Sequence, residues 1–324
     1  GYLFVPVGEA TDVLEKEVAA AVHAGLDTVA AVTTVPLPFN TGPALRLPAQ
    51  AQFHVLKYLN GLGAAILRRG GQIFTGAHVV EIEDGSPATI STDSGIEIAA
   101  NDVIVATNTP INNRVAIHTK QAAYRTYVIG MTLPRGIVQP LLAWDTCDPY
   151  HYIRLAPLDA THDLLIVGGE DHKTGQDDNP ESRYERLETW TRKRFALAGT
   201  VEYRWSGQIM EPVDGMAFIG RNPGDKHIYM VSGDSGNGLT HGAVAGMLLT
   251  DLIVGRENPW AALYDPGRVR LRAGGDFIKE TLNMAAQYGD WARGGDVATV
   301  DEIARGEGAV IRDGLHKVAV YRDE

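Results

Sequence analysis

Residues Ser232–Thr240 read SGDSGNGLT and lie between a short apolar run, Ile228–Ser232, and a helical run, Ala243–Val254. Three glycines in this loop remove side chains where a backbone must turn sharply or approach a ligand closely. The following helix presents free backbone N–H groups and the positive end of its dipole to the loop. Such an end suits a phosphate or another anionic group. A glycine-rich turn without a ligand is the alternative, because short glycine patterns also occur by chance.

Helices and short strands are expected upstream of this loop. Apolar residues recur at helical spacing over residues 9–25, 50–68 and 180–196. Strand-like runs bounded by turn residues predict strands at Gln72–Phe74, Val79–Glu83, Thr89–Thr92, Gly95–Ala99, Tyr124–Met131, Tyr150–Leu155 and Leu164–Gly169. The later, well-separated strands are typical of an antiparallel sheet.

The run Asp102–Thr107 (DVIVAT) differs from these strands because it is apolar without alternation. Continuous apolarity is typical of a parallel strand that is buried on both faces. Ligands of open α/β sheets bind at the carboxyl ends of such strands, which is the position of Ala106 and Thr107. We therefore expect a ligand at this strand end.

The composition of the 324-residue chain argues against several partners. A net charge of −11 argues against nucleic acid, because no basic face is evident that could offset phosphate repulsion. There is no run of about eighteen apolar residues that would indicate a membrane span. Cys147 is the only cysteine, so an intrachain disulfide is impossible, which favours a reducing, cytoplasmic compartment.

Four segments in a fixed order resemble the C-terminal half of the D-amino-acid oxidase and glycine oxidase family. They are Trp205-Ser206-Gly207, Pro212-Val213-Asp214-Gly215, Phe218-Ile219-Gly220-Arg221 and the loop Gly233–Thr240. In that family a WxG segment, a PxDGxPxIG segment and a glycine-rich loop build the flavin side of the site. Upstream, Arg68–Phe74, Val79–Ile82 and Val103–Asn108 look like the family's adenine-side strand and second cofactor-contacting strand end.

The resemblance implies an FAD cofactor and an amine or amino-acid substrate. Carried over position by position, it implies cofactor contacts from Val80, Ala106, Thr107, Gly207, Gly233, Ser235, Gly236, Asn237, Gly238, Leu239 and Thr240. It also implies oxidation of a C–N bond, in which hydride leaves the carbon alpha to the amine and reaches flavin N5. The helix after Gly238 would stabilise negative charge on the reduced ring.

The chain departs from the family in its first residues. The dinucleotide fingerprint GxGxxG, which should precede the segments above, is absent, and Gly61-Leu62-Gly63 falls inside an expected helix. The chain begins with Gly1 rather than Met, and we expect a sequence truncated at its N-terminus. The alternative is a non-catalytic flavin-fold remnant or fragment that binds no cofactor.

The C-terminal tail indicates a second, incomplete module. Val297–Ile303, Val310–Asp313 and Lys317–Arg322 are strand-like, and Ile311–Tyr321 (IRDGLHKVAVY) resembles the opening hairpin of a Rieske iron–sulfur domain, as fused to some members of the flavin family. A 2Fe–2S cluster needs two Cys and two His in CxH and CxxH boxes, which this sequence lacks. We therefore assign no metal ligand and expect the cluster only if a complete Rieske domain follows.

If such a domain follows, electrons leave through the cluster, which favours a dehydrogenase over an oxidase. Without it, the electron acceptor is unknown. An unrelated β tail is the alternative to the Rieske interpretation.

Residues Tyr150–Arg154 (YHYIR) are the candidate substrate site. On a strand, Tyr150, Tyr152 and Arg154 point to one face, and His151 points to the other. A Tyr–Arg face can bind a carboxylate, because a guanidinium meets it with two parallel charged hydrogen bonds. The resembled family often uses Tyr and Arg of its substrate sheet in this way. A solvated polar strand face is the alternative, and the sequence does not decide which side looks inward.

These observations predict a mixed α/β flavoprotein fold with interleaved domains. An FAD/NAD(P)-binding-type three-layer domain would comprise residues 49–110 and 213–260. An antiparallel-sheet substrate domain would comprise residues 1–48 and 111–212. Residues 285–324 would form the incomplete β module.

Overall fold

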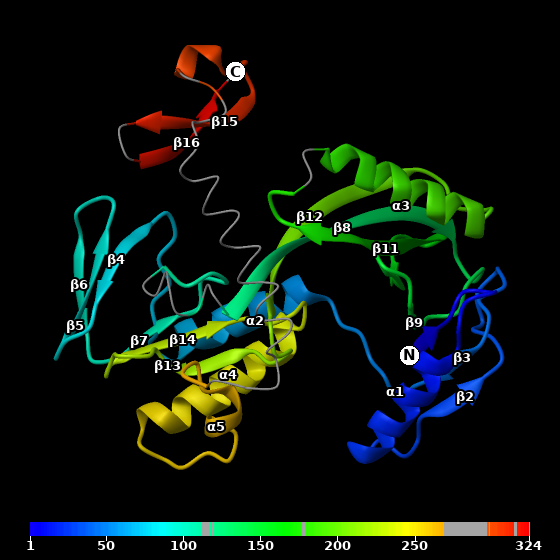
Figure 1. Ribbon diagram of the computed structural model, residues 1–324, viewed down its shortest axis with the longest axis horizontal. Helices are drawn as coiled ribbons and strands as arrows, with labels where there is room; N and C mark the ends of the chain where they lie inside the picture. Colours follow the sequence, from blue (N-terminus) through cyan, green and yellow to red (C-terminus); the bar gives the residue numbers. More distant parts are fainter. Residues whose placement is uncertain are drawn as a thin grey trace. The chain divides into compact units, whose positions relative to one another are not determined.

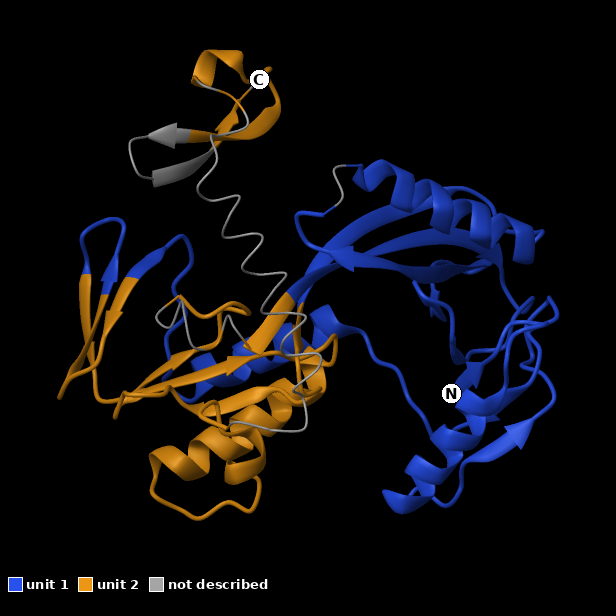
Figure 2. Ribbon diagram, in the orientation of Figure 1, with its two compact units in different colours: residues 1–80, 91–96, 123–209 blue, residues 81–90, 97–122, 210–324 orange. Residues whose placement is uncertain are grey.

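The computed structural model describes residues 1–111, 117, 120–176, 179–268, 297, 299–313 and 316–323. The chain divides into two compact units that alternate along the sequence (Figure 2). Unit 1 comprises residues 1–80, 91–96 and 123–209, and unit 2 comprises residues 81–90, 97–122 and 210–324. The domain boundaries expected from the sequence stay a prediction.

Unit 1 is built on a mixed sheet with the strand order β12-β8-β11-β10-β9-β1-β3-β2 (Figure 1). Its strands are β1 Tyr2–Phe4, β2 Ala30–Val32, β3 Ala44–Arg46, β8 Gln121–Pro134, β9 Leu142–Asp145, β10 His151–Pro157, β11 His162–Lys173 and β12 Val201–Pro212. The central neighbours β8, β11, β10 and β9 pair antiparallel, whereas β1 pairs parallel with β9. The antiparallel pattern expected for the middle of the chain is confirmed.

Helix α3 (Pro180–Arg194) packs on this sheet (Figure 1). The helix begins where Asn179 Oδ1 accepts a hydrogen bond from the Ser182 N–H and Pro180 occupies the first turn. Its buried face carries Leu187 and Trp190. These two side chains join a core that also contains Tyr127, Ile129, Met131, Leu133, Ile153, Leu155, Leu165 and Val167. Alternate residues of β8, β10 and β11 therefore face α3.

Two further helices belong to unit 1. Helix α1 (Asp12–His23) buries Leu14 with Val5 and Leu45. Helix α2 (Val55–Arg68) starts later than the expected residue 50, where His54 Nδ1 accepts a hydrogen bond from the Lys57 N–H. No residue of α2 is buried among the described residues.

The strand expected at Gln72–Phe74 is wrong. No strand is formed there, and Phe74 is 76% exposed. A strand requires a hydrogen-bonded neighbour, and no described strand pairs with this segment.

Unit 2 is layered around the small sheet β13-β14-β7. Strand β13 (Phe218–Arg221) pairs antiparallel with β14 (Ile228–Ser232), which pairs parallel with β7 (Val103–Val105). Helix α4 (Gly238–Ile253) covers one face, with Leu248 and Leu249 against Ile219 and Tyr229.

On the other face of this sheet, Val103, Val105 and Ile228 pack with Ala88. Ala88 belongs to the three-stranded sheet formed by β4 Val79–Glu83, β5 Ala88–Thr92 and β6 Glu97–Ala100. The short helix α5 (Ala261–Tyr264) follows α4 and contacts β13. Unit 2 thus has three layers. Its parallel strand pair is β14 with β7, and β7 lies in the apolar run 102–107.

One expectation for that run is wrong. Its continuous apolarity predicted burial on both faces, but Ile104 is 49% exposed while its neighbours Val103 and Val105 are buried. The three-residue strand lies at the edge of its sheet, and the described residues leave the Ile104 face uncovered.

The tail contains a hairpin of β15 (Glu307–Asp313) and β16 (His316–Arg322). Residues 314 and 315 of its turn, and residue 298 of the expected strand Val297–Ile303, lie outside the described residues. Within Val297–Ile303 the structure forms the 3-10 helix η3 (Val300–Glu302), so a strand is wrong at these positions. No helix in the described ranges is both long and apolar enough to cross a membrane.

Candidate functional site

The glycine-rich loop makes a tight turn between β14 and α4 in unit 2. Three of its residues are left-handed: Gly233 (φ +70°), Ser235 (φ +50°) and Gly236 (φ +73°). A Cβ on Gly233 would come within 2.8 Å of Pro212 Cγ and 3.2 Å of Phe218 Cδ2. The backbone conformation and the close packing both require glycine at position 233.

Helix α4 begins with exposed backbone at Gly238, Leu239 and Thr240. Its first turn contains no acidic residue, and the preceding Asn237 makes no side-chain capping hydrogen bond. The N–H groups of a first helical turn have no partner within the helix and lie at the positive end of its dipole. This helix start can therefore accept an anionic or electron-rich ligand edge.

Asp234 lies inside the loop and leaves a buried acceptor unsatisfied. Its Oδ1 atom is buried with no hydrogen-bond partner among the described residues. Its Oδ2 atom would lie 2.4 Å from a Cβ added to Gly238, so glycine at 238 makes room for this carboxylate. A buried acceptor calls for a donor, which a bound group with N–H or O–H groups can supply.

Neighbouring contacts hold the loop in place. The Ser235 N–H donates to the Met210 carbonyl at 3.1 Å, and Ser235 Oγ donates to Glu211 Oε2. His241 Nδ1 lies 3.2 Å from the Asp234 carbonyl oxygen. Glu211 was missed by the sequence reasoning, although it directly precedes the PVDG segment.

The ends of β7 and β14 lie together. Their parallel register pairs Val105 with Met230, so Ala106 and Thr107 leave β7 where Ser232 and Gly233 leave β14. Ser232 Oγ donates to the Asn108 carbonyl at 2.6 Å. The structure thus brings Ala106 and Thr107 together with the predicted loop residues, as ligand binding at strand ends requires.

Gln121 also contacts the end of β14. Its Nε2 atom donates to the buried Ser232 Oγ at 2.9 Å. No sequence signal marks Gln121, because it reaches Ser232 only through the tertiary fold.

Two of the predicted cofactor residues are not in unit 2. Val80 lies on β4 and Gly207 on β12, and both are assigned to unit 1. Val80 is 48% exposed. Their cofactor contacts stay a prediction.

The candidate substrate residues Tyr150, Tyr152 and Arg154 lie in unit 1, in strand β10 or directly before it. His151, Ile153 and Leu155 are buried, whereas Tyr152 and Arg154 are partly exposed. Since Ile153 and Leu155 pack in the core with α3, strand alternation places Tyr152 and Arg154 on the opposite face of the sheet. The structure therefore decides the orientation that the sequence left open: His151 faces α3.

Tyr152 lies flat across the neighbouring strand. Its partner in the register is Gly168, and a Cβ there would come within 2.2 Å of Tyr152 Cζ. Tyr150 precedes β10, and its ring centroid is 6.2 Å from that of Tyr152. The glycine at 168 thus provides the surface on which the Tyr152 ring rests.

Burial, with the nearby Asp171 carboxylate, raises the pKa of Tyr152 to about 12. In the unfolded chain the phenol has its ordinary pKa of 10.0. Between pH 10 and 12 the unfolded chain therefore loses this proton while the folded chain keeps it, which favours unfolding. We expect the Tyr152 contribution to stability to be intact below pH 10 and to be lost as the pH rises to 12. Urea unfolding across this window should show a steeper decline for the parent chain than for Tyr152→Phe. Identical pH slopes would contradict the raised pKa.

Comparisons with known proteins agree with this architecture. Residues 1–252 match the family model described as FAD dependent oxidoreductase, DAO. The chain is 26% identical over 307 residues to YhfW of Bacillus subtilis, and the match covers 90% of this chain and 58% of that protein. The name of YhfW describes it as a Rieske 2Fe-2S iron–sulfur protein. It is 28% identical to gamma-glutamylputrescine oxidoreductase of Escherichia coli, covering 62% of this chain and 48% of that protein. The chain thus spans about half the length of these curated relatives.

Among solved structures, glycine oxidase from Geobacillus kaustophilus has a TM-score of 0.71 at 18% identity, covering 83% of this chain and 74% of that one. L-proline dehydrogenase from P. horikoshii has a TM-score of 0.67 at 17% identity, covering 83% and 77% of the respective chains. These two similarities establish the fold. The match over residues 1–252 identifies this chain as a member of the DAO family of FAD-dependent oxidoreductases.

Proposed function

We propose that this chain provides the flavin loop and the substrate sheet of an enzyme that oxidises the C–N bond of a small amine or amino acid. The observation that supports this most strongly is the loop Ser232–Thr240, with its left-handed turn, its unsatisfied Asp234 oxygen and its open helix start. FAD supplies the acceptor for the hydrogen and the two electrons that leave the substrate carbon.

The residues of unit 2 fit an FAD ring and its ribityl chain. Gly238–Thr240 are exposed residues in the first turn of α4, where free N–H groups and the helix dipole favour negative charge. The buried Asp234 Oδ1 can accept from an N–H or hydroxyl donor of the cofactor. Glycine at 233 lets the loop pack against Pro212 and Phe218, and the absence of a side chain at Gly236 leaves room for close approach of a planar group.

The β10 face of unit 1 is proposed to hold the substrate. Arg154 provides a permanent positive charge and paired N–H donors for a carboxylate. Tyr152 is a neutral phenol near neutral pH, as an ordinary tyrosine with a pKa of 10.0 would be, and burial raises its pKa further, to about 12. A neutral phenol donates a hydrogen bond to a carboxylate, where a phenolate would repel it. Arg154 and Tyr152 would therefore orient an amino-acid substrate.

The cofactor assignment predicts a loss of FAD binding in Gly233→Ala. The new side chain would meet Pro212 and Phe218 and would oppose the left-handed backbone, so the loop must shift. In a titration followed by flavin fluorescence, we expect affinity to fall at least tenfold, about 1.4 kcal/mol. Gly224→Ala is the matched control, because Gly224 is also left-handed (φ +96°) but has no atom within 4 Å of an added Cβ.

A parent chain that stays colourless after incubation with FAD and desalting would contradict cofactor binding by these residues. That result would instead support the non-catalytic alternative for this chain.

The substrate assignment predicts a selective defect in Arg154→Met. Losing a charged hydrogen-bond partner costs about 1.5–3 kcal/mol, so kcat/KM for flavin reduction by an amino acid should fall roughly 10- to 150-fold. Reduction by a simple amine without a carboxylate should change little. Equal losses with both substrate types would contradict carboxylate binding by Arg154. Arg135→Met, which removes an exposed arginine paired with Asp163, is the control.

We infer further that the complete protein is a dehydrogenase that passes electrons to a Rieske cluster, in a reducing, cytoplasmic compartment. The hairpin β15–β16 and the similarity to YhfW support the electron route, and the single cysteine supports the compartment. Rapid peroxide formation by the complete protein without an added acceptor would contradict the electron route.

A further inference from the structure

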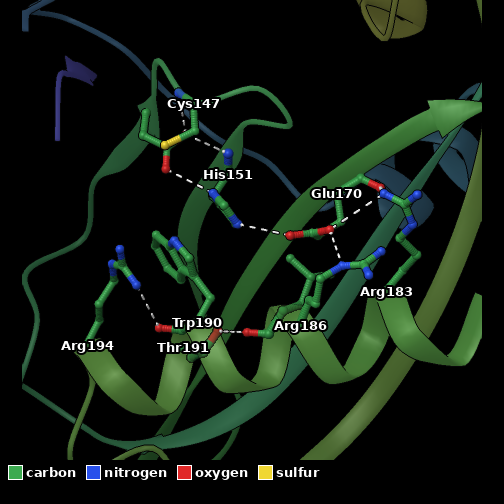
Figure 3. A network of polar contacts seen from close by, with 10 residues as sticks. Cys147, His151, Glu170, Arg183, Arg186, Trp190, Thr191 and Arg194 are labelled. Carbon is green, nitrogen blue, oxygen red and sulfur yellow. Dashed lines mark hydrogen bonds and ion pairs between the residues drawn. The ribbon is translucent and has the colours of Figure 1, made fainter. Parts of the chain in front are cut away.

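Three side chains of types that bind metals in other proteins lie close together where β9 leads into β10. The antiparallel register pairs Trp144 with Tyr152, so Asp145 and His151 form the next opposed pair. Cys147 lies in the loop that joins them. A carboxylate oxygen, the thiol sulfur and a ring nitrogen of these three residues lie within 4.8 Å of one another. Figure 3 shows Cys147 and His151 side by side at this end of the sheet.

The Asp145 carboxylate is held in one orientation. Its Oδ1 atom accepts the backbone N–H groups of Cys147 at 3.2 Å and His151 at 2.8 Å. Its Oδ2 atom lies 2.9 Å from His151 Nδ1. The side chain is 1% exposed, so the backbone rather than water fixes this geometry. The Asp145 carboxylate therefore lies close to both His151 Nδ1 and the Cys147 thiol.

The second ring nitrogen of His151 has no hydrogen-bond partner in the part of the chain that the structure describes. Nε2 is buried and 3.6 Å from Glu170 Oε1, beyond hydrogen-bond distance, and the His151 side chain is 8% exposed. Glu170 itself accepts from Arg186 Nε at 2.7 Å (Figure 3). In a neutral ring whose proton lies on Nδ1, a bare lone pair at Nε2 faces this carboxylate, which is unfavourable.

A cation bound at Nδ1 removes this conflict. The ring proton then lies on Nε2 and is donated toward Glu170. Metal-binding histidines usually donate their second N–H to a carboxylate in this way, which fixes the tautomer and the ring orientation. Trp190 stacks on the His151 ring at 4.5 Å between centroids and 14° between planes, which also fixes the ring.

We propose that Asp145, Cys147 and His151 bind a zinc-class divalent cation, with the Glu170 carboxylate as the charged group that the protonated Nε2 of His151 faces. Thiolate, imidazole and carboxylate are the donors found in four-coordinate zinc sites, and three protein ligands leave the fourth position to water. A cavity of about 470 Å³, lined in part by His151, Glu170 and Arg186, lies next to the histidine ligand. The site lies on the α3 side of the sheet, away from Tyr152 and Arg154, and takes no part in the proposed flavin chemistry.

Cobalt(II) chloride is the probe for the first experiment, added to the purified, tag-free chain. A thiolate bound to cobalt gives a charge-transfer band in the near ultraviolet, and Cys147 is the only cysteine in the chain, so the band reports on this residue alone. We expect the band to saturate at one equivalent per chain and zinc chloride to displace it. Saturation at one equivalent per two chains would indicate a thiolate shared between molecules and would overturn the proposal, as would the absence of the band.

Two variants separate this site from adventitious binding. Glu170→Gln should weaken cobalt affinity about 10- to 100-fold while keeping the charge-transfer band at saturation, since the ligands are intact. His162→Gln is the matched control, because His162 is exposed beside Asp159 and offers an imidazole–carboxylate pair on the surface. An affinity lost in His162→Gln and unchanged in Glu170→Gln would overturn the proposal.

A measurement on the parent chain avoids any question of misfolded variants. Zinc chloride should slow alkylation of Cys147 by iodoacetamide at least tenfold, and a chelator should restore the rate. An unchanged rate would mean that His151 is held between Asp145 and Glu170 without a cation, contrary to the proposal.

Discussion

Arg268→Ala is expected to lower the free energy of unfolding by about 3–5 kcal/mol, because it leaves a buried carboxylate without its partner. Arg268 Nε and Nη2 each donate to one oxygen of Asp214 at 2.8 Å. The two side chains are only 7% and 13% exposed. Water therefore cannot replace the lost guanidinium, and the Asp214 charge would stay buried and unpaired.

The same guanidinium also anchors the chain that leads into β13. It donates to the carbonyl oxygens of Met216 and Ala217 and lies 4.1 Å above the centroid of the Phe218 ring. Removing it releases backbone acceptors as well as the carboxylate. Phe218 also packs against Gly233, so we expect FAD binding to weaken together with stability.

Urea denaturation checks this prediction. Arg256→Ala is the matched control, because Arg256 pairs with Asp251 at 2.7 Å while remaining 64% exposed. An exposed pair of this kind contributes about 0–1 kcal/mol. Similar unfolding midpoints for the two variants would show that the Asp214 pair does not have the stabilising role that its burial indicates.

Gly169→Ala is expected to destabilise the fold by about 2–6 kcal/mol, as the sum of backbone strain and overpacking. Gly169 has φ +137°, and an added Cβ would lie 1.9 Å from the Tyr150 carbonyl oxygen. That oxygen belongs to the backbone of the paired segment and cannot rotate away. The strand pair β10–β11 would have to separate locally.

The disturbance should extend to the neighbouring residue. Glu170 is itself left-handed (φ +57°), and the register between β8 and β11 shifts between Gly169 and His172. This irregularity presents the Glu170 carboxylate to His151. We therefore expect Gly169→Ala to weaken cobalt binding at Asp145, Cys147 and His151 in addition to lowering the melting temperature.

Gly136→Ala separates backbone strain from the steric clash. Gly136 has φ +84° and nothing within 4 Å of an added Cβ, so this variant should cost only about 1 kcal/mol. A thermal melt of the two variants side by side gives the comparison. If Gly169→Ala were no less stable than Gly136→Ala, the close approach to Tyr150 would not be a constraint on this fold.

Local sequence patterns predicted the elements whose residues interact with near neighbours. Helix α3 follows from its apolar spacing, and β14 and β4 have the bounds read from their apolar runs. The loop Ser232–Thr240 was also recognisable, because left-handed turns and close packing require glycine wherever they occur. These features depend on chain segments of a few residues.

Elements that depend on distant partners were missed. The sequence analysis did not identify β1, β2 or β3, which are three residues long and are stabilised by pairing with one another and with β9. The segment Gln72–Phe74 has strand-like residues but no paired neighbour. Strand propensity is weak compared with the contacts that a sheet supplies.

The sequence by itself determined the family, the glycine loop and the strand that carries Tyr152 and Arg154, because motif order and residue type carry that information along the chain. Only the tertiary structure decided which side of β10 faces α3, because alternation gives two faces but not the packing partner of either. The tertiary structure also brought Arg268 to Asp214 and Glu170 to His151. The sequence analysis assigned no metal ligand, since Asp145, Cys147 and His151 match no recognised spacing. Their convergence arises from the pairing of β9 with β10 and from a bulge in β11, and such register details are set by long-range packing.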